Sequence, residues 1–315
     1  MSGSEPVAVI EAALRDGVVH GSVELDVITV AGADAVDYLQ GQLSQNVNSL
    51  TVGETRWTLL LQPQGKIDAW MRLHRVDADR LWLVVDAGFG DDALARLERF
   101  KLRVDVTMIL DRRVAVGLRG PGSGRAAEQF APDAGVVVVD AGWGPVPGFD
   151  LVPDGGEPPD AESESGFGLA VDDQTMELVR VMQGRPSMGR ELDASTIPAA
   201  AGVVDRSVDF TKGCYVGQEL VARIDSRGNN TPTRLVRVTG SSASMPALGS
   251  TLLAGGTEAG TLTSAARSSS SGFVGLAYVK RAVDVPGQAA VETIDGSTAA
   301  VELLPLDPPT ASDIG

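Results

Sequence analysis

Apolar and polar residues alternate along much of the first ninety positions, and this pattern predicts β-strands. The segment "SVELDVITV" (22–30) alternates and is rich in β-branched residues, and "RLWLVVD" (80–86) is a second apolar run. Between them, "TRWTLLLQ" (55–62) and "KIDAWMRLHRV" (66–76) flank the turn residues "PQG". The N-terminal part is therefore expected to contain a sheet that includes one β-hairpin.

The second arm of this hairpin has one apolar and one polar face, because side chains alternate along a strand. The apolar face holds Ile67, Ala69, Met71 and Leu73, and the polar face holds Lys66, Asp68, Trp70, Arg72 and His74. The polar face either meets solvent or lines a polar cleft. Solvent is the commoner answer for an antiparallel sheet, so we expect solvation.

Helical spacing of apolar residues follows these strands at several points. The segment 32–43 is one such helix, with Asp34 as its expected cap, and 90–102 and 172–184 are two more. Beyond about residue 232 the pattern changes to short β-prone runs separated by Gly, Ser and Pro, which is typical of a small barrel or sandwich. The acidic, proline-rich segment 153–166 is expected to be an exposed loop, and 307–315 a frayed tail.

Length and composition favour a globular protein of two or three domains, since the chain has 315 residues of which 43% are hydrophobic. A single cysteine excludes an intrachain disulfide, and the N-terminus has neither the basic nor the apolar region of a secretory signal. No apolar stretch approaches the roughly 20 residues that a membrane-spanning helix needs. These features predict a cytoplasmic protein.

The net charge is −16, but its distribution is uneven. The segment 212–237 has a local charge of +3, which leaves −19 on the rest of the chain. Such a surface would repel nucleic acid and anionic membranes over most of its area. The basic segment suits a small anionic ligand, although its arginines could equally pair with acids elsewhere in the fold.

The only cysteine, Cys214, lies in "FTKGCYVGQELVAR" (210–223). A free cysteine is more often buried and inert than reactive. Here Gly213 allows close approach, Lys212 would favour a thiolate, and the helix that can begin in "GQELVAR" would favour it too. The surroundings therefore indicate a partly exposed, electropositive thiol.

Two kinds of cysteine chemistry lack partners in this sequence. A nucleophilic cysteine usually needs a histidine base, and neither His20 nor His74 has a sequence signal that links it to Cys214. An iron–sulfur cluster takes about four ligands. Cys214 could therefore supply at most one ligand, shared with another chain or a small thiol.

The octapeptide "KGCYVGQE" (212–219) resembles the signature of the YgfZ-type folate-binding family, a branch of the aminomethyltransferase (glycine cleavage T-protein) superfamily associated with iron–sulfur enzymes. Further resemblance lies in "AGADAVDYLQGQLSQNV" (31–47), "LLLQPQGKIDAWMRLHR" (59–75) and "VRVMQGRPSMGREL" (179–192). In order and spacing these segments cover most of residues 22–237.

This resemblance implies an α+β fold of three lobes with a central folate pocket. Residues 1–231 would form the folate-binding region, as two intertwined α/β lobes, and 232–315 a C-terminal β-barrel domain. The implied ligand is tetrahydrofolate. The implied partners are folate and iron–sulfur client or assembly proteins, with no nucleic acid and no membrane, and we expect a monomer.

The resemblance also implies site residues. Glu191 would pair with the pterin ring, since a carboxylate accepts two parallel hydrogen bonds from such an edge. Arg223 would meet the anionic benzoyl-glutamate portion, and Tyr215 and Gln218 would also contact folate. Asp68, Lys212 and Cys214 would form the reactive group, with Asp68 near the reactive folate nitrogen.

Two departures from the aminomethyltransferases bear on function. Their acidic pair is here Asp68 followed by Ala69, and they lack a cysteine at the position of Cys214. The leading hypothesis is therefore a folate-binding accessory protein for iron–sulfur cluster assembly or repair that uses the Cys214 thiol. The alternatives are a tetrahydrofolate-dependent aminomethyltransferase or N-demethylating transferase, and a docking module without a ligand.

Overall fold

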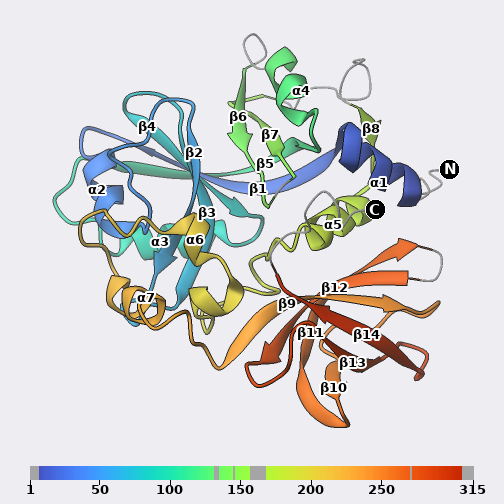
Figure 1. Cartoon of the computed structure of the whole chain (residues 1–315). Helices are drawn as coiled ribbons and strands as arrows, with labels where there is room; N and C mark the ends of the chain where they lie inside the picture. The colour runs from blue at the N-terminus through green and yellow to red at the C-terminus, as the bar shows by residue number, and fades with distance from the viewer. Residues whose placement is uncertain (1–6, 131–134, 145, 157–167, 270–271, 307–315) are drawn as a thin grey trace.

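The computed structural model describes residues 7–130, 135–144, 146–156, 168–269 and 272–306, and it contains an open sheet and a closed barrel (Figure 1). The predicted combination of mixed α/β lobes with a C-terminal β-barrel is confirmed. The segments expected to be a loop after residue 156 and a tail at 307–315 lie outside the described residues.

The open sheet is built around a long strand that pairs on both of its edges. Strand β1 is antiparallel to β4 on one side and to β5 on the other, and the path runs β2-β3-β4-β1-β5-β7-β6, with β8 parallel to one end of β1. The strands are β1 (Val19–Ala31), β2 (Thr55–Leu61), β3 (Ile67–Arg75), β4 (Arg80–Asp86), β5 (Thr107–Arg119), β6 (Val136–Asp140), β7 (Gly148–Pro153) and β8 (Leu169–Ala170).

Helix α5 packs between the open sheet and the barrel. It contacts β1 of the sheet and β11 and β12 of the barrel, and it lies between the two in Figure 1. The helices are α1 (Val7–Asp16), α2 (Ala35–Gln42), α3 (Gly90–Glu98), α4 (Ser123–Phe130), α5 (Asp173–Met182), α6 (Val204–Ser207) and α7 (Gln218–Asp225), with a 3₁₀ turn, η1 (Pro198–Ala201). The helices expected around 32–43, 90–102 and 172–184 are thus present.

The C-terminal strands close into a barrel in the order β10-β11-β12-β9-β14-β13. They are β9 (Thr233–Ser241), β10 (Thr251–Ala254), β11 (Thr257–Ser269), β12 (Gly272–Lys280), β13 (Gly287–Glu292) and β14 (Thr298–Leu304). Inward-facing apolar residues such as Val238, Leu262 and Phe273 fill its interior. Closure leaves no unpaired edge on which another strand could add.

The expected solvation of the polar face of β3 is wrong. Trp70, Arg72 and His74 are all at most 5% exposed. Trp70 stacks on Trp57 with ring centroids 4.0 Å apart and meets Trp143 edge to face at 5.2 Å. The hairpin is buried on both faces because a second layer, which includes Trp143 and α6, covers the face that the alternation assigned to water.

The expected side-chain capping of α2 by Asp34 is also wrong. Asp34 occupies the N-cap position, but its side chain makes no capping bond. Its Oδ2 instead accepts a hydrogen bond from the backbone N–H of Asp105, at 2.7 Å. Asp34 therefore joins the start of α2 to the segment before β5, which is a contact between distant parts of the chain.

Candidate functional site

The loop that carries the cysteine is held to the rest of the protein by Lys212. This loop, residues 209–217, is called the signature loop below. The Lys212 Nζ donates hydrogen bonds to the backbone carbonyls of Gln40, Leu43 and Gln45 at 2.7, 2.6 and 2.8 Å. These carbonyls lie at and just beyond the C-terminal end of α2, where a cation is favourable. Burial lowers the pKa of Lys212 to about 8, so it is mostly charged at neutral pH.

A second anchor is a close approach between two glycines. Gly217 has φ +82°, and a Cβ there would lie 2.5 Å from the carbonyl oxygen of Gln62. Gly65 in the β2–β3 turn has φ +74°, and a Cβ there would lie 2.6 Å from the Cβ of Leu220. Both positions require glycine, because the backbone is left-handed and there is no room for a side chain. The hairpin and the signature loop therefore meet backbone to backbone.

Cys214 itself is exposed. The neighbouring Gly213 has open space around it, whereas Tyr215 is partly buried against an apolar cluster, where burial raises its pKa to about 12. Gln218 begins α7 and its Oε1 accepts a hydrogen bond from the Tyr215 N–H, at 3.2 Å. The thiol is thus presented to solvent on a loop whose two ends are fixed.

Both histidines are buried in strands of the open sheet, whereas Cys214 is exposed. His74 is buried in β3 and its Nδ1 lies 2.8 Å from the Thr55 hydroxyl, and His20 is buried in β1. Burial lowers the pKa of His74 to about 4. Within the described part of the chain, no group of three or more His, Cys, Asp and Glu residues could hold a metal ion.

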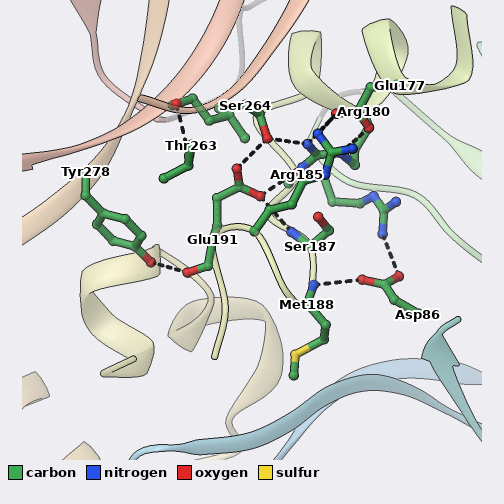
Figure 2. A network of polar contacts seen from close by, with 12 residues as sticks. Asp86, Glu177, Arg180, Arg185, Ser187, Met188, Glu191, Thr263, Ser264 and Tyr278 are labelled. Carbon is green, nitrogen blue, oxygen red and sulfur yellow. Dashed lines mark hydrogen bonds and ion pairs between the residues drawn. The ribbon is translucent and has the colours of Figure 1, made fainter. Parts of the chain in front are cut away.

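Glu191 lies in a buried polar network beside the barrel, and its side chain is enclosed on all sides (Figure 2). Its Oε1 accepts a hydrogen bond from the Ser264 hydroxyl at 2.6 Å, and its Oε2 accepts from Arg180 Nη1 and from the Ser187 N–H, both at 3.1 Å. The Tyr278 hydroxyl donates to its backbone carbonyl at 2.8 Å. A pterin contact by Glu191 therefore requires its carboxylate to exchange these partners for the ligand.

Asp68 lies in β3 and Arg223 in α7. The Asp68 carboxylate accepts a hydrogen bond from Arg96 of α3, with Nε and Oδ2 2.9 Å apart. Arg223 lies in the last turn of α7 and is exposed. Cys214, Lys212, Tyr215 and Gln218 therefore lie in and beside the signature loop, whereas the side-chain partners of Glu191 and Asp68 lie outside that loop.

A cavity of about 460 Å³ lies between the open sheet and α5. We call it the α5 cavity. Its lining includes residues from β1, from α5, from the end of β4 and from the segment 183–190, among them Asp86, Arg119, Arg180, Gln183, Arg185 and Arg190. None of the seven residues predicted from the sequence lines it. The sequence signals that could have found it are the acid that ends the strand at Asp86 and the arginines inside the segment 179–192.

The wall of the α5 cavity is supported by a buried charge cluster. Asp150 of β7 accepts hydrogen bonds from Arg72 at 2.5 Å and from Arg119 at 2.8 Å, and all three side chains are at most 8% exposed. Burial alone would raise the pKa of Asp150, but the two guanidinium groups outweigh it and lower the pKa to about 2. Asp150 is therefore ionised and holds Arg119 in place beside the cavity.

The cavity has the size of a small-molecule site and a lining of both charge signs. Small-molecule sites commonly measure about 300–1,000 Å³. Asp86 offers a carboxylate, Arg185 offers a guanidinium, and the buried Gln183 Nε2 has no hydrogen-bond partner among the described residues. Residues of both signs around one space can meet a ligand that has an amino-pyrimidine edge and carboxylates.

Comparison with known proteins identifies chains of similar sequence. Residues 13–143 match the GCVT N-terminal domain. The tRNA-modifying protein YgfZ of Klebsiella pneumoniae is 29% identical over 71% of this chain and 72% of its own length. The iron–sulfur cluster assembly factor IBA57 homolog of Pyricularia oryzae, a mitochondrial protein, is 29% identical over 64% of this chain and 52% of its own length. Other bacterial YgfZ proteins match over 65% and 66% of their length.

A solved structure extends the likeness to the whole fold. The aminomethyltransferase of the glycine cleavage system from Bartonella henselae superposes with a TM-score of 0.79 at 21% identity. The superposition covers 96% of this chain and 89% of that protein. The predicted aminomethyltransferase-like fold is therefore confirmed. No described helix has the length and apolar character needed to cross a membrane.

Proposed function

The chain is a YgfZ-type member of the aminomethyltransferase superfamily, and we propose that it is a tetrahydrofolate-binding accessory protein for iron–sulfur enzymes. In this proposal it supports the assembly or repair of clusters in client enzymes, and Cys214 is its functional thiol. Its relatives include proteins named for tRNA modification and for iron–sulfur cluster assembly. These names support an iron–sulfur role at the level of the family.

The observation that carries the proposal is the exposed thiol of Cys214 on an anchored loop. A structural cysteine is usually buried, and a buried thiol would be inert. Lys212 and Gly217 instead fix the loop at both ends and leave Cys214 open to solvent. A rigidly presented thiol suits transient contact with a client protein or with one iron of its cluster.

Lys212 acts in this proposal by positioning. Its three donors are taken up by backbone carbonyls, so it holds the signature loop and contributes a positive charge nearby. Tyr215 and Gln218 order the start of α7 behind the thiol. Their predicted contacts with folate, and those of Glu191 and Arg223, remain proposals.

Tetrahydrofolate binding is proposed for the α5 cavity. The support is its volume of about 460 Å³ and its mixture of carboxylate and guanidinium groups. Bound folate would supply one-carbon chemistry or act as a structural ligand. We further propose a cytoplasmic protein, since a single cysteine cannot form an intrachain disulfide, and we propose that it is a monomer.

The transferase alternative gains no support from Asp68. A transferase of this superfamily would need an acid beside the reactive folate nitrogen, whereas the Asp68 carboxylate is paired with Arg96 and does not line the α5 cavity. Asp86 does line that cavity. A test for methylene-tetrahydrofolate formation from glycine-derived or methylated amines separates the two functions.

Complementation tests the role of the thiol. Cells that lack this protein, and whose iron–sulfur enzymes depend on it, would receive the unmodified chain or Cys214→Ala. We expect Cys214→Ala to leave client-enzyme activity at the level of the deleted strain. Gly213→Ala is the matched control, because a Cβ there meets open space, and it should restore activity. Full activity with Cys214→Ala would remove the thiol from the mechanism.

A further inference from the structure

The α5 cavity contains several arginines, and their guanidinium groups differ in how many partners they have. Arg180 donates to Glu177, Glu191, Ser264 and the carbonyl of Arg185. Arg119 donates to Asp150 and to the carbonyls of Leu118 and Phe149. Both groups are therefore occupied by the protein and serve the wall of the cavity.

Arg185 is different. Its nearest described acid is Asp86, with Nη1 and Oδ1 3.7 Å apart, which is beyond hydrogen-bond distance. No hydrogen bond from its guanidinium to another described residue is present. The side chain is 19% exposed, and Figure 2 shows it extending toward Asp86, away from the Glu191 network. The guanidinium of Arg185, which lines the cavity, therefore makes no hydrogen bond to a described residue, and its ion pair is the 3.7 Å contact with Asp86.

The charges around Arg185 do not balance it. Burial, together with the nearby charges of Arg180, Arg119 and Arg72, lowers its pKa to about 10 against the opposing effect of Asp86. The Asp86 carboxylate also serves a second group, because its Oδ2 accepts a hydrogen bond from the Met188 N–H at 3.0 Å. Arg185 remains cationic at neutral pH. An anion that enters the cavity could therefore accept hydrogen bonds from its guanidinium, and this charged interaction is strengthened because water is largely excluded there.

We propose that Arg185 is the anion-binding residue of the α5 cavity and holds a carboxylate of the glutamate portion of tetrahydrofolate. The assignment rests on the proposed function, and it differs from the expectation that Arg223 meets this group. Arg223 is exposed in α7 and does not line the cavity, whereas Arg185 does. A planar guanidinium can bind such a carboxylate through two parallel hydrogen bonds.

Calorimetry with two ligands tests the assignment. The ligands are tetrahydrofolate and its diamide, in which both glutamate carboxylates are carboxamides. Arg185→Met should weaken tetrahydrofolate binding about 10- to 100-fold, as expected for hydrogen bonds to a charged group, and change diamide binding less than about twofold. Arg185→Lys, which keeps the charge but not the bidentate geometry, should fall between Arg185→Met and the unmodified protein.

The control is Arg125→Met, which removes one exposed arginine of α4 that does not line the cavity. It should leave both affinities unchanged. Equal weakening of both ligands by Arg185→Met would mean a structural role and would overturn the assignment. Weakening of tetrahydrofolate by Arg223→Met, with none by Arg185→Met, would also overturn it. No binding of either ligand to the unmodified protein would refute the proposed function itself, and the assignment with it.

Discussion

The signature loop and the α5 cavity use their basic residues in opposite ways. In the signature loop, Lys212 donates three hydrogen bonds to backbone carbonyls, and the group exposed to solvent is the Cys214 thiol. In the α5 cavity, Arg119 and Arg180 donate hydrogen bonds to residues of the wall, whereas the Arg185 guanidinium makes no hydrogen bond to a described residue and pairs with Asp86 at 3.7 Å. A cation near a site is thus informative only once its partners are known.

The two regions also differ in what fixes them. The signature loop is anchored by a backbone approach between Gly217 and Gly65 and by the Lys212 contacts. The α5 cavity is anchored by buried ion pairs centred on Asp150. The β2–β3 hairpin links them, since its turn meets the signature loop and Arg72 of β3 meets Asp150.

The largest effect is expected from Asp150→Asn, which would leave Arg72 and Arg119 buried beside a neutral group. Loss of one member of a buried ion pair costs about 3–5 kcal/mol of the free energy of unfolding, measurable by urea denaturation. The control is Asp154→Asn, because Asp154 is 27% exposed and pairs with Arg80 near the surface. It should cost less than about 1 kcal/mol. Equal losses would mean that the cavity does not depend on buried charge.

The next effect concerns pH and His74. Its pKa is about 4 in the folded protein and 6.5 in the unfolded chain, so between these values the unfolded chain binds a proton that the folded protein does not. The free energy of unfolding should therefore fall by about 3 kcal/mol from this group as the pH drops from 6.5 to 4. His74→Gln should lack this part of the decrease in urea titrations. Parallel pH profiles for the two proteins would contradict the prediction.

The smallest effect is expected in the signature loop, where two glycines form a matched pair. Gly217→Ala introduces a Cβ at a left-handed residue, 2.5 Å from a carbonyl oxygen, and should lower the free energy of unfolding by about 2 kcal/mol. Gly213→Ala meets nothing within 4 Å and should change it by less than about 0.5 kcal/mol. If both variants behave alike in thermal unfolding, the loop is not anchored at Gly217.

Much of the fold could be predicted because local patterns and turn residues agree with it. The strands around 22–30 and 80–86, the hairpin around "PQG" and the helix at 172–184 are present where periodicity indicated them. The solvated face of β3 could not be predicted correctly, because alternation shows that two faces differ but does not show what covers the second one. Trp70 and Arg72 are buried by segments more than seventy residues away.

The site was predicted less completely. The signature around Cys214 is contiguous, so a resemblance could find it, and Lys212 and Gln218 lie within it. The α5 cavity is assembled from β1, the ends of β4 and β5, α5 and the segment 183–190. No local pattern joins Asp86 to Arg185, because their proximity arises only when the sheet and α5 pack together.

The sequence by itself determined the element types, the presence of a C-terminal β-barrel, the family resemblance and the position of the one thiol, since each depends on residues close together in the chain. Only the tertiary structure decided which charged groups are free. Lys212 and Arg185 both lie in segments that resemble the family, yet distant backbone carbonyls accept the hydrogen bonds of Lys212, whereas the Arg185 guanidinium makes no hydrogen bond to a described residue. Hydrogen-bond partners come from distant segments, and sequence spacing does not carry that information.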